Sequence, residues 1–130
     1  MVEYLNPNTV HAPVGAYSHT AKVPSGTEML FISGQVAVRT DGSIPATFVE
    51  QAELVFENLH ACLAAHGVGM GSVVKLAAFI VVGQDVQAMR EVRQRHLGSH
   101  RPTSTAVYVP ALVSPAFLLE VEAVAVKASR

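Results

Sequence analysis

The sequence predicts an α+β fold in which two helices pack on one face of a mixed β-sheet. Apolar residues recur at helical spacing in two segments, around residues 48–63 and 86–97. Five other segments are rich in β-branched residues or alternate as strands do, which leads to the order β-β-α-β-α-β-β. A chain of 130 residues is one ordinary domain in length, so we expect a single domain over residues 1–130.

The N-terminal third predicts two strands. An irregular loop precedes a short strand over Ser18–Val23, and residues 24–27 have the composition of a turn. The second strand is expected over Met29–Val38, with Gly34 inside it. A glycine within a strand indicates a bulge or the close approach of another group.

The first helix has the clearest signals. Thr47 followed by Glu50 is a capping-box pattern, and Gly67 is a natural end. Cys62 lies near the apolar stripe and is predicted to be a buried core residue, not a nucleophile. The stripe itself consists of Phe48, Ala52, Val55, Leu59 and Leu63.

The second helix is predicted between Asp85, a suitable N-cap, and Gly98. Its apolar positions, which we expect to face inward, are Val86, Met89, Val92 and Leu97. Its basic residues, which we expect to form a solvated face, are Arg90, Arg93 and Arg95.

The remaining segments predict three strands. Val73–Val82 is an apolar run broken only by Lys75, which is typical of a strand covered on both faces. Thr103–Val109 is also strand-like. In the last strand, Leu118–Val126, alternation places Leu118, Glu120, Glu122, Val124 and Val126 on one face and Leu119, Val121, Ala123 and Ala125 on the other. The sheet face opposite the helices needs a cover, and we expect a partner subunit to supply it.

Composition excludes several classes. Half of the residues are apolar and 15% are charged, so the chain is not disordered. Nine Lys and Arg against ten Asp and Glu give a net charge of −1, which supplies no basic excess for nucleic acid. The single cysteine excludes an intrachain disulfide. No segment resembles a targeting sequence or membrane span, and we expect a cytoplasmic protein.

No pattern in the sequence supports a metal site or a nucleotide site. Six histidines are present, but His96 and His100 are separated by Gly98, which should end their helix. The glycine-rich stretch at residues 67–71 follows a helix, whereas a phosphate-binding loop follows a strand. We therefore expect no metal and no cofactor.

Two glutamates are the first candidates for chemistry. Glu120 and Glu122 share a strand face with three apolar residues. A carboxylate among apolar neighbours is desolvated, which suits general acid or base catalysis. The alternative is that both glutamates pair with lysine or arginine, or lie at a wet edge.

Several local patterns together resemble the YjgF/RidA family of reactive-intermediate deaminases, over almost the whole chain. The stretch from Ala12 to Tyr17-Ser18 resembles the family's Ala-Pro…Tyr-Ser motif, and Ser33-Gly34-Gln35 resembles its strand ending Ser-Gly-Gln. Gln51 followed by Asn58-Leu59 is similar to its helix motif, and the segment Glu120–Val126 is similar to its last strand.

The resemblance implies a chorismate-mutase-like α+β domain that assembles as a homotrimer, with three small-molecule clefts between subunits. It implies hydrolysis of 2-imino or 2-enamino acids to 2-keto acids and ammonia. In that activity Glu120 would position the water and Tyr17 would line the cleft. At Ser33 and Gly34 the missing glycine side chain would allow the backbone to approach closely.

The sequence departs from the family pattern at one position. Ser104 stands where the active members of the family have an arginine that binds the substrate carboxylate, and Ala106 stands where some have a cysteine. Arg101 lies three residues earlier, and a bent loop or a partner subunit could present it. Arg39 is a second arginine that could reach the cleft.

Three functions stay open at this point. The first is a hydrolytic deaminase acting on an imine or enamine, with Ser104 and Arg101 among its substrate-binding residues. The second is a non-catalytic trimer that binds or senses a small metabolite. The third is an endoribonuclease or translation inhibitor, as some family members are labelled, although the charge gives it no support.

Overall fold

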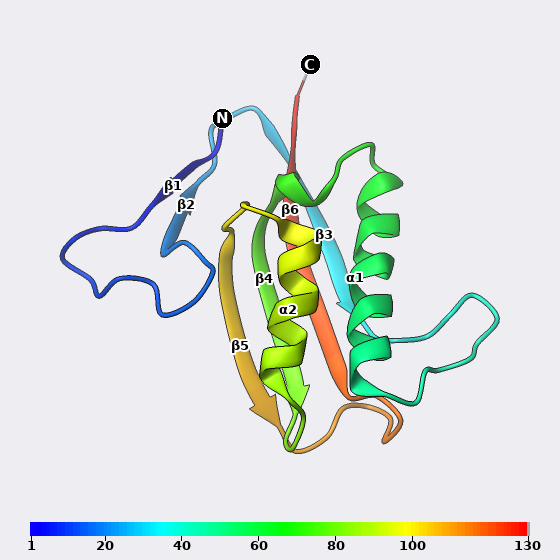
Figure 1. Ribbon diagram of the computed structural model, residues 1–130. Helices are drawn as coiled ribbons and strands as arrows, with labels where there is room; N and C mark the ends of the chain where they lie inside the picture. Colours follow the sequence, from blue (N-terminus) through cyan, green and yellow to red (C-terminus); the bar gives the residue numbers. More distant parts are fainter. Residues whose placement is uncertain (130) are drawn as a thin grey trace.

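The computed structural model describes residues 1–129 and has a four-stranded sheet as its main feature (Figure 1). The strands are β3 (Thr27–Gln35), β4 (Val73–Val81), β5 (Thr103–Val109) and β6 (Leu119–Ala128). Their order is β3-β6-β4-β5, in which β6 is antiparallel to both neighbours and β4 is parallel to β5. The sheet is therefore mixed, as the sequence predicts.

Helices α1 (Phe48–Ala64) and α2 (Val86–Leu97) lie on the same side of this sheet (Figure 1). The Thr47 hydroxyl accepts a hydrogen bond from Glu50 N at 3.2 Å, which confirms Thr47 as the N-cap. The Glu50 carboxylate accepts from the Thr47 hydroxyl at 2.8 Å and not from the Thr47 amide, so the predicted capping box forms only in part. Asp85 accepts from the amides of residues 87 and 88 and caps α2. The expected α+β fold with two helices on one sheet face is confirmed.

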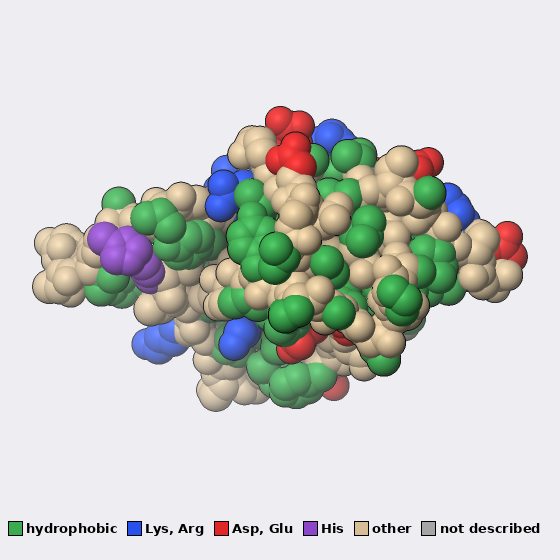
Figure 2. Space-filling model, turned by 90° about the horizontal axis from the view of Figure 1, so that it is seen from below, with side chains coloured by type: hydrophobic (Ala, Val, Ile, Leu, Met, Phe, Trp, Pro, Cys, Tyr) green, Lys and Arg blue, Asp and Glu red, His purple; other side chains and the backbone are tan. Residues whose placement is uncertain are grey.

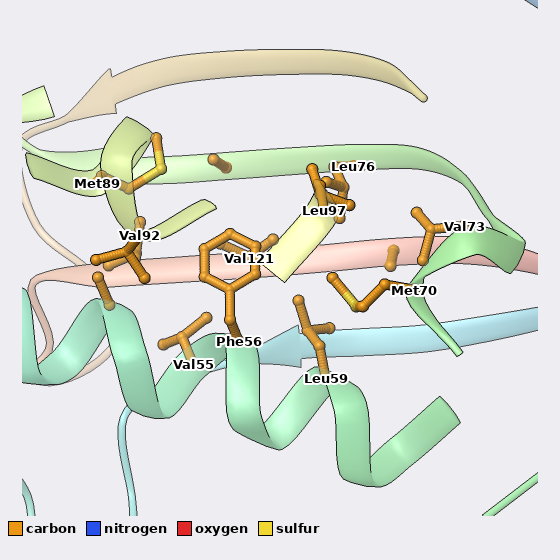
Figure 3. Packing of buried hydrophobic residues seen from close by; sticks show 14 of the residues in the cluster. Val55, Phe56, Leu59, Met70, Val73, Leu76, Met89, Val92, Leu97 and Val121 are labelled. Atoms are coloured by element: carbon orange, nitrogen blue, oxygen red, sulfur yellow. The ribbon is translucent and has the colours of Figure 1, made fainter. Parts of the chain in front are cut away.

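The core lies between the helices and the sheet. Phe56 and Leu59 of α1 point toward Val121 of β6, and Val92 of α2 faces the same space (Figure 3). The predicted alternation of β6 is confirmed, because its buried residues toward the helices are Leu119, Val121, Ala123 and Ala125. Cys62, predicted to be buried, is only half-buried and packs at the margin of this core.

The opposite face of the sheet is open within the described residues. Phe31 of β3 is 79% exposed there, and Phe79 of β4 is only half-buried. The apolar run of β4 therefore has one covered face in a single chain, and its predicted second cover stays a prediction.

The N-terminal segment forms an extension that the sequence did not predict in full. Strand β1 (Glu3–Leu5) pairs antiparallel with β2 (Thr20–Lys22), and the extension stands out from the body with histidine side chains gathered on it (Figure 2). Tyr4 anchors the extension, because its hydroxyl donates a hydrogen bond to Val73 O at 3.2 Å. Burial raises the pKa of this hydroxyl. Strand β1 and the 3-10 turn η1 (Met70–Ser72), each three residues long, were not predicted.

Two polar side chains of α1 hold the loops that flank the sheet. Gln51 is buried, and its amide donates to Pro45 O at 2.9 Å and Ala116 O at 2.8 Å. Its carbonyl accepts from Leu118 N at 2.9 Å. Asn58 donates to the carbonyls of residues 36 and 38. These contacts give a structural role to the helix motif.

The two helices also contact each other through histidines. The His96 ring stacks on Phe56 with 5.3 Å between ring centroids, and His60 lies 5.2 Å away. Burial lowers the pKa of both histidines from its ordinary value, which favours their neutral forms. His96 Nε2 also lies 3.1 Å from a carboxylate oxygen of Glu53 on α1. Within residues 1–129 no helix is long and apolar enough to cross a membrane.

Candidate functional site

A cavity of about 740 Å³ lies beside α2, between residues 14–17 of the N-terminal loop and the first half of β5. Three of the predicted binding residues line it, namely Tyr17, Arg101 and Ser104. Its other walls combine apolar side chains, such as Val14, Val86, Met89 and Leu97, with polar and charged side chains of α2. A cavity that joins apolar walls with convergent polar groups is typical of a small-molecule site.

Ser18 places the N-terminal loop against this cavity. Its side chain is buried, and its hydroxyl donates to Arg101 O at 2.5 Å. Its amide donates to Pro102 O at 3.0 Å. The Tyr-Ser pair therefore has divided roles, because Ser18 anchors the loop while Tyr17 faces the cavity.

Ser104 faces the helix side of the sheet. It pairs in register with Leu76 of β4, which in turn pairs with Ala123 of β6, and both partners are buried beneath the helices. Because paired residues in a sheet share a face, Ser104 points toward α2. Ala106, two residues later, lies on the same face and lines the same cavity.

Arg101 reaches the cavity through a bent loop. It precedes β5 and is not part of the strand, so the strand alternation does not determine where its side chain points. Its guanidinium donates to Gly98 O at 2.7 Å and His100 O at 3.2 Å, at the C-terminal end of α2. Arg39 lies elsewhere, in a loop where its guanidinium donates to the Ser43 hydroxyl.

The predicted solvated face of α2 is wrong for Arg93. This side chain is partly buried, lines the cavity and donates to Ala16 O at 3.1 Å. Burial lowers the pKa of its guanidinium, and nearby Arg101 and Arg90 lower it further. The signal in the sequence was its spacing, since Met89 and Leu97 lie four residues to either side and place Arg93 within the apolar stripe.

Glu120 and Gly34 meet on the open face of the sheet. A methyl group added at Gly34 would come within 2.8 Å of Glu120 Cδ and 2.9 Å of its Cγ. The strand register is irregular between Ile32 and Gln35, which is the bulge that the glycine predicted. Ser33, beside them, is exposed.

The sequence left open that Glu120 and Glu122 pair with lysine or arginine or lie at a wet edge, and the structure meets this alternative only in part. Glu122 is exposed, as a residue at a wet surface would be, whereas Glu120 is half-buried. Within residues 1–129, neither glutamate forms a salt bridge. Glu120 is thus a partly desolvated carboxylate whose side chain fills the space that Gly34 leaves free.

One chain therefore presents two groups of predicted site residues on opposite sheet faces. The cavity beside α2 holds Tyr17, Arg101 and Ser104, and the open face holds Ser33, Gly34 and Glu120. The pairing of Glu120 with Phe79, which itself pairs with Val107, confirms that Glu120 points away from the helices. No cluster of three potential metal ligands occurs among the described residues.

The fold and these two groups define a small α+β protein with a cavity suited to a small molecule. The family model of the endoribonuclease L-PSP proteins matches residues 9–127, and the chain belongs to this family, which includes the YjgF/RidA proteins.

Named relatives cover nearly the whole chain. It is 34% identical to the putative reactive intermediate deaminase TdcF of Escherichia coli over 93% of this chain and 95% of that protein. It is 30% identical to a RutC family protein of Pyrococcus horikoshii, over 98% of this chain and 99% of the other.

Solved structures have the same architecture. The Rid-family protein YyfB of Yersinia pestis matches with a TM-score of 0.83 and 27% identity, covering 95% of this chain and 97% of that one. Escherichia coli TdcF with bound serine matches with a TM-score of 0.72 and 32% identity, covering 97% and 99%. That relative thus binds a small amino acid.

Proposed function

We propose that this protein is a reactive-intermediate deaminase of the RidA type that acts on an imine or enamine in clefts between the subunits of a homotrimer. The observation that carries the proposal is Glu120, a half-buried carboxylate without a salt bridge in the described chain, which lies against Gly34 on the uncovered sheet face. The membership in the family and the named deaminase relative support it.

Assembly would join the two residue groups. If the edge strand β5 of one subunit docks on the open face of the next, the cavity beside α2 faces the neighbour's Ser33, Gly34 and Glu120. The open face carries apolar side chains such as Phe31, whose burial would favour this contact. We also propose a cytoplasmic location, which the absence of any possible intrachain disulfide accommodates.

In the proposed reaction, Glu120 accepts a proton from a water molecule as the water oxygen bonds to the imine carbon. The imine nitrogen gains that proton, which gives a carbinolamine with a hydroxyl and an amino group on the same carbon. The hydroxyl proton then passes to the amino nitrogen through Glu120 as the C–N bond breaks, which releases ammonia and leaves a carbonyl group. The close approach at Gly34 keeps the carboxylate beside the backbone of β3, where the substrate would lie.

Oligomerisation is the first test of this proposal. Light scattering of the purified chain at micromolar concentration is expected to give three times the mass of one chain. A monomer would remove the cleft between subunits and overturn the assignment of both residue groups to one site.

The second test concerns position 104. An amino-acid oxidase would generate 2-imino acids, and 2-keto acid formation would be followed with a trapping reagent present. We expect Ser104→Arg to raise the rate on 2-imino acids by at least about tenfold, because a guanidinium binds a carboxylate with two parallel hydrogen bonds. Ala106→Arg, on the same strand face, is the matched control and should not raise the rate.

A non-catalytic binding trimer is the second candidate. Ser104 favours it, since this position lacks the arginine that the resemblance to active members leads us to expect. Ligand binding without turnover in both the native chain and Ser104→Arg would favour this candidate over the deaminase. The nuclease function has the weakest support, because the net charge is −1.

A further inference from the structure

The cavity beside α2 concentrates positive charge. Arg90, Arg93, Arg95 and Arg101 all line it. Arg90 and Arg93 are three residues apart on α2 and so lie on one side of the helix, and Arg101 follows the end of that helix. Arg93 and Arg101 are half-buried there, whereas Arg90 and Arg95 are exposed. Like charges placed close together repel one another, most strongly where they are partly desolvated.

The chain supplies little negative charge to balance these arginines. Arg95 forms an ion pair with Glu53, outside the cavity wall. In residues 1–129, neither Arg90, Arg93 nor Arg101 forms a salt bridge. Glu91 also lines the cavity, but residues one or two positions apart on a helix do not face each other, so it is poorly placed to pair with Arg90 or Arg93.

Arg93 has unused hydrogen-bonding capacity in a buried position. Within residues 1–129, its Nε is buried and has no hydrogen-bond partner, and its guanidinium donates to Ala16 O alone. Buried polar groups are normally paired, and an unpaired one at the wall of a cavity indicates a group that a ligand would satisfy. The Ala16 contact also holds the guanidinium in place before any ligand arrives.

We infer that Arg93 and Arg101 form an anion-binding end of this cavity, and that its ligand is a small organic carboxylate with an apolar body. The two guanidinium groups would supply part of the carboxylate binding that the missing arginine at position 104 leaves open, and an arginine at that position would add to it. The inference therefore deepens the proposed function and rests on it for the reaction. The inferred binding of the ligand does not depend on the proposed reaction.

The apolar walls determine the rest of the ligand. Val14, Val86, Met89 and Leu97 line the same space, and about 740 Å³ is far more than an inorganic ion fills. A carboxylate against the arginines with a branched aliphatic or aromatic body against these walls satisfies both parts of the cavity. A free phosphate would satisfy only the charged end.

The test is calorimetric titration of the full chain with 4-methyl-2-oxopentanoate, a branched 2-keto acid. The uncharged 4-methyl-2-oxopentanamide and inorganic phosphate are titrated in parallel. We expect the keto acid to bind at least about tenfold more tightly than the amide or phosphate. Equal binding of keto acid and amide, or no measurable binding of the keto acid, would overturn the inference. Tighter binding of phosphate than of the keto acid would overturn the assignment of an organic carboxylate as the ligand.

Arg93→Gln should weaken binding of the keto acid at least about tenfold. Arg93→Lys should fall between this variant and the native chain, since lysine keeps the charge but lacks the fork. Arg39→Gln removes the same charge from a loop outside the cavity and should bind as the native chain does. Native-like binding by Arg93→Gln would refute the role of Arg93.

Thermal unfolding without ligand separates a binding role from a structural one. Arg93→Gln should melt no lower than the native chain, because it loses a repelled, partly buried charge and only one hydrogen bond. A large fall in Tm would show that Arg93 is a structural residue. The turnover of Glu120→Gln tests the deaminase function separately from the anion-binding role of Arg93. If Arg93→Gln binds the keto acid normally while Glu120→Gln loses turnover, only the role of Arg93 is refuted.

Discussion

Glu120→Gln is expected to lose at least about 100-fold in turnover of an imine while keeping ligand affinity within a few fold. The amide has nearly the shape of the carboxylate and still fits beside Gly34, but it cannot accept a proton from water. The measurement is the rate of 2-keto acid formation in the oxidase-coupled assay. It is made in the native chain and also in the Ser104→Arg background.

Glu122→Gln is the matched control for this experiment. Glu122 lies on the same face of β6 two residues later, and it is exposed. Its neutralisation removes the same charge from the same strand and should change turnover by less than about twofold. Equal losses in both variants would point to a general electrostatic effect, and unchanged turnover in Glu120→Gln would contradict the catalytic role.

Gln51→Leu should lower the free energy of unfolding by about 2 kcal/mol or more, since each buried polar group left without a partner costs roughly 1–3 kcal/mol. Leucine is close in size but removes the partner of Pro45 O, in a buried residue, and of Leu118 N, in a half-buried one, as well as of the more exposed Ala116 O. Such a loss is a large share of the stability of a small domain. Urea unfolding followed by circular dichroism measures it.

Gln87→Leu supplies the comparison for this variant. Gln87 is an exposed residue of α2 whose side chain forms no hydrogen bond in the described structure, so its replacement should change the free energy of unfolding by less than about 0.5 kcal/mol. Similar losses in both variants would contradict the anchoring role of Gln51. Leu118 lies two residues before Glu120, so loosening this anchor should also lower turnover more than the change in folded fraction explains.

The positions of the helices and the faces of β6, which depend on local periodicity, were predicted from the sequence and confirmed. The spacing of apolar residues and the caps at Thr47 and Asp85 located both helices, because a helix is organised by interactions three and four residues apart. The alternation in β6 identified which of its residues face the core, for the same local reason. The strand glycine at position 34 predicted a close approach, and the structure has one.

Where local pattern and tertiary packing compete, the sequence was insufficient. Arg93 has the spacing of the apolar stripe, but only the fold shows that the N-terminal loop lies against it beside a cavity. Arg101 precedes the predicted strand, and only the fold shows that its side chain lines the same cavity as Ser104. Strand β1 was not predicted, because its partner β2 lies fifteen residues later and no local pattern marks the pairing.

The sequence by itself determined the fold class, the element order and the residues that resemble the family's site. Only the tertiary structure decided which of those residues share a face: register pairs Glu120 with Phe79 and Ser104 with Leu76, so they lie on opposite sides of one sheet. The physical reason is that a strand's side chains alternate with a period of two, whereas the pairing between distant strands sets which face each residue occupies. That pairing depends on contacts across the whole chain, which no local segment encodes.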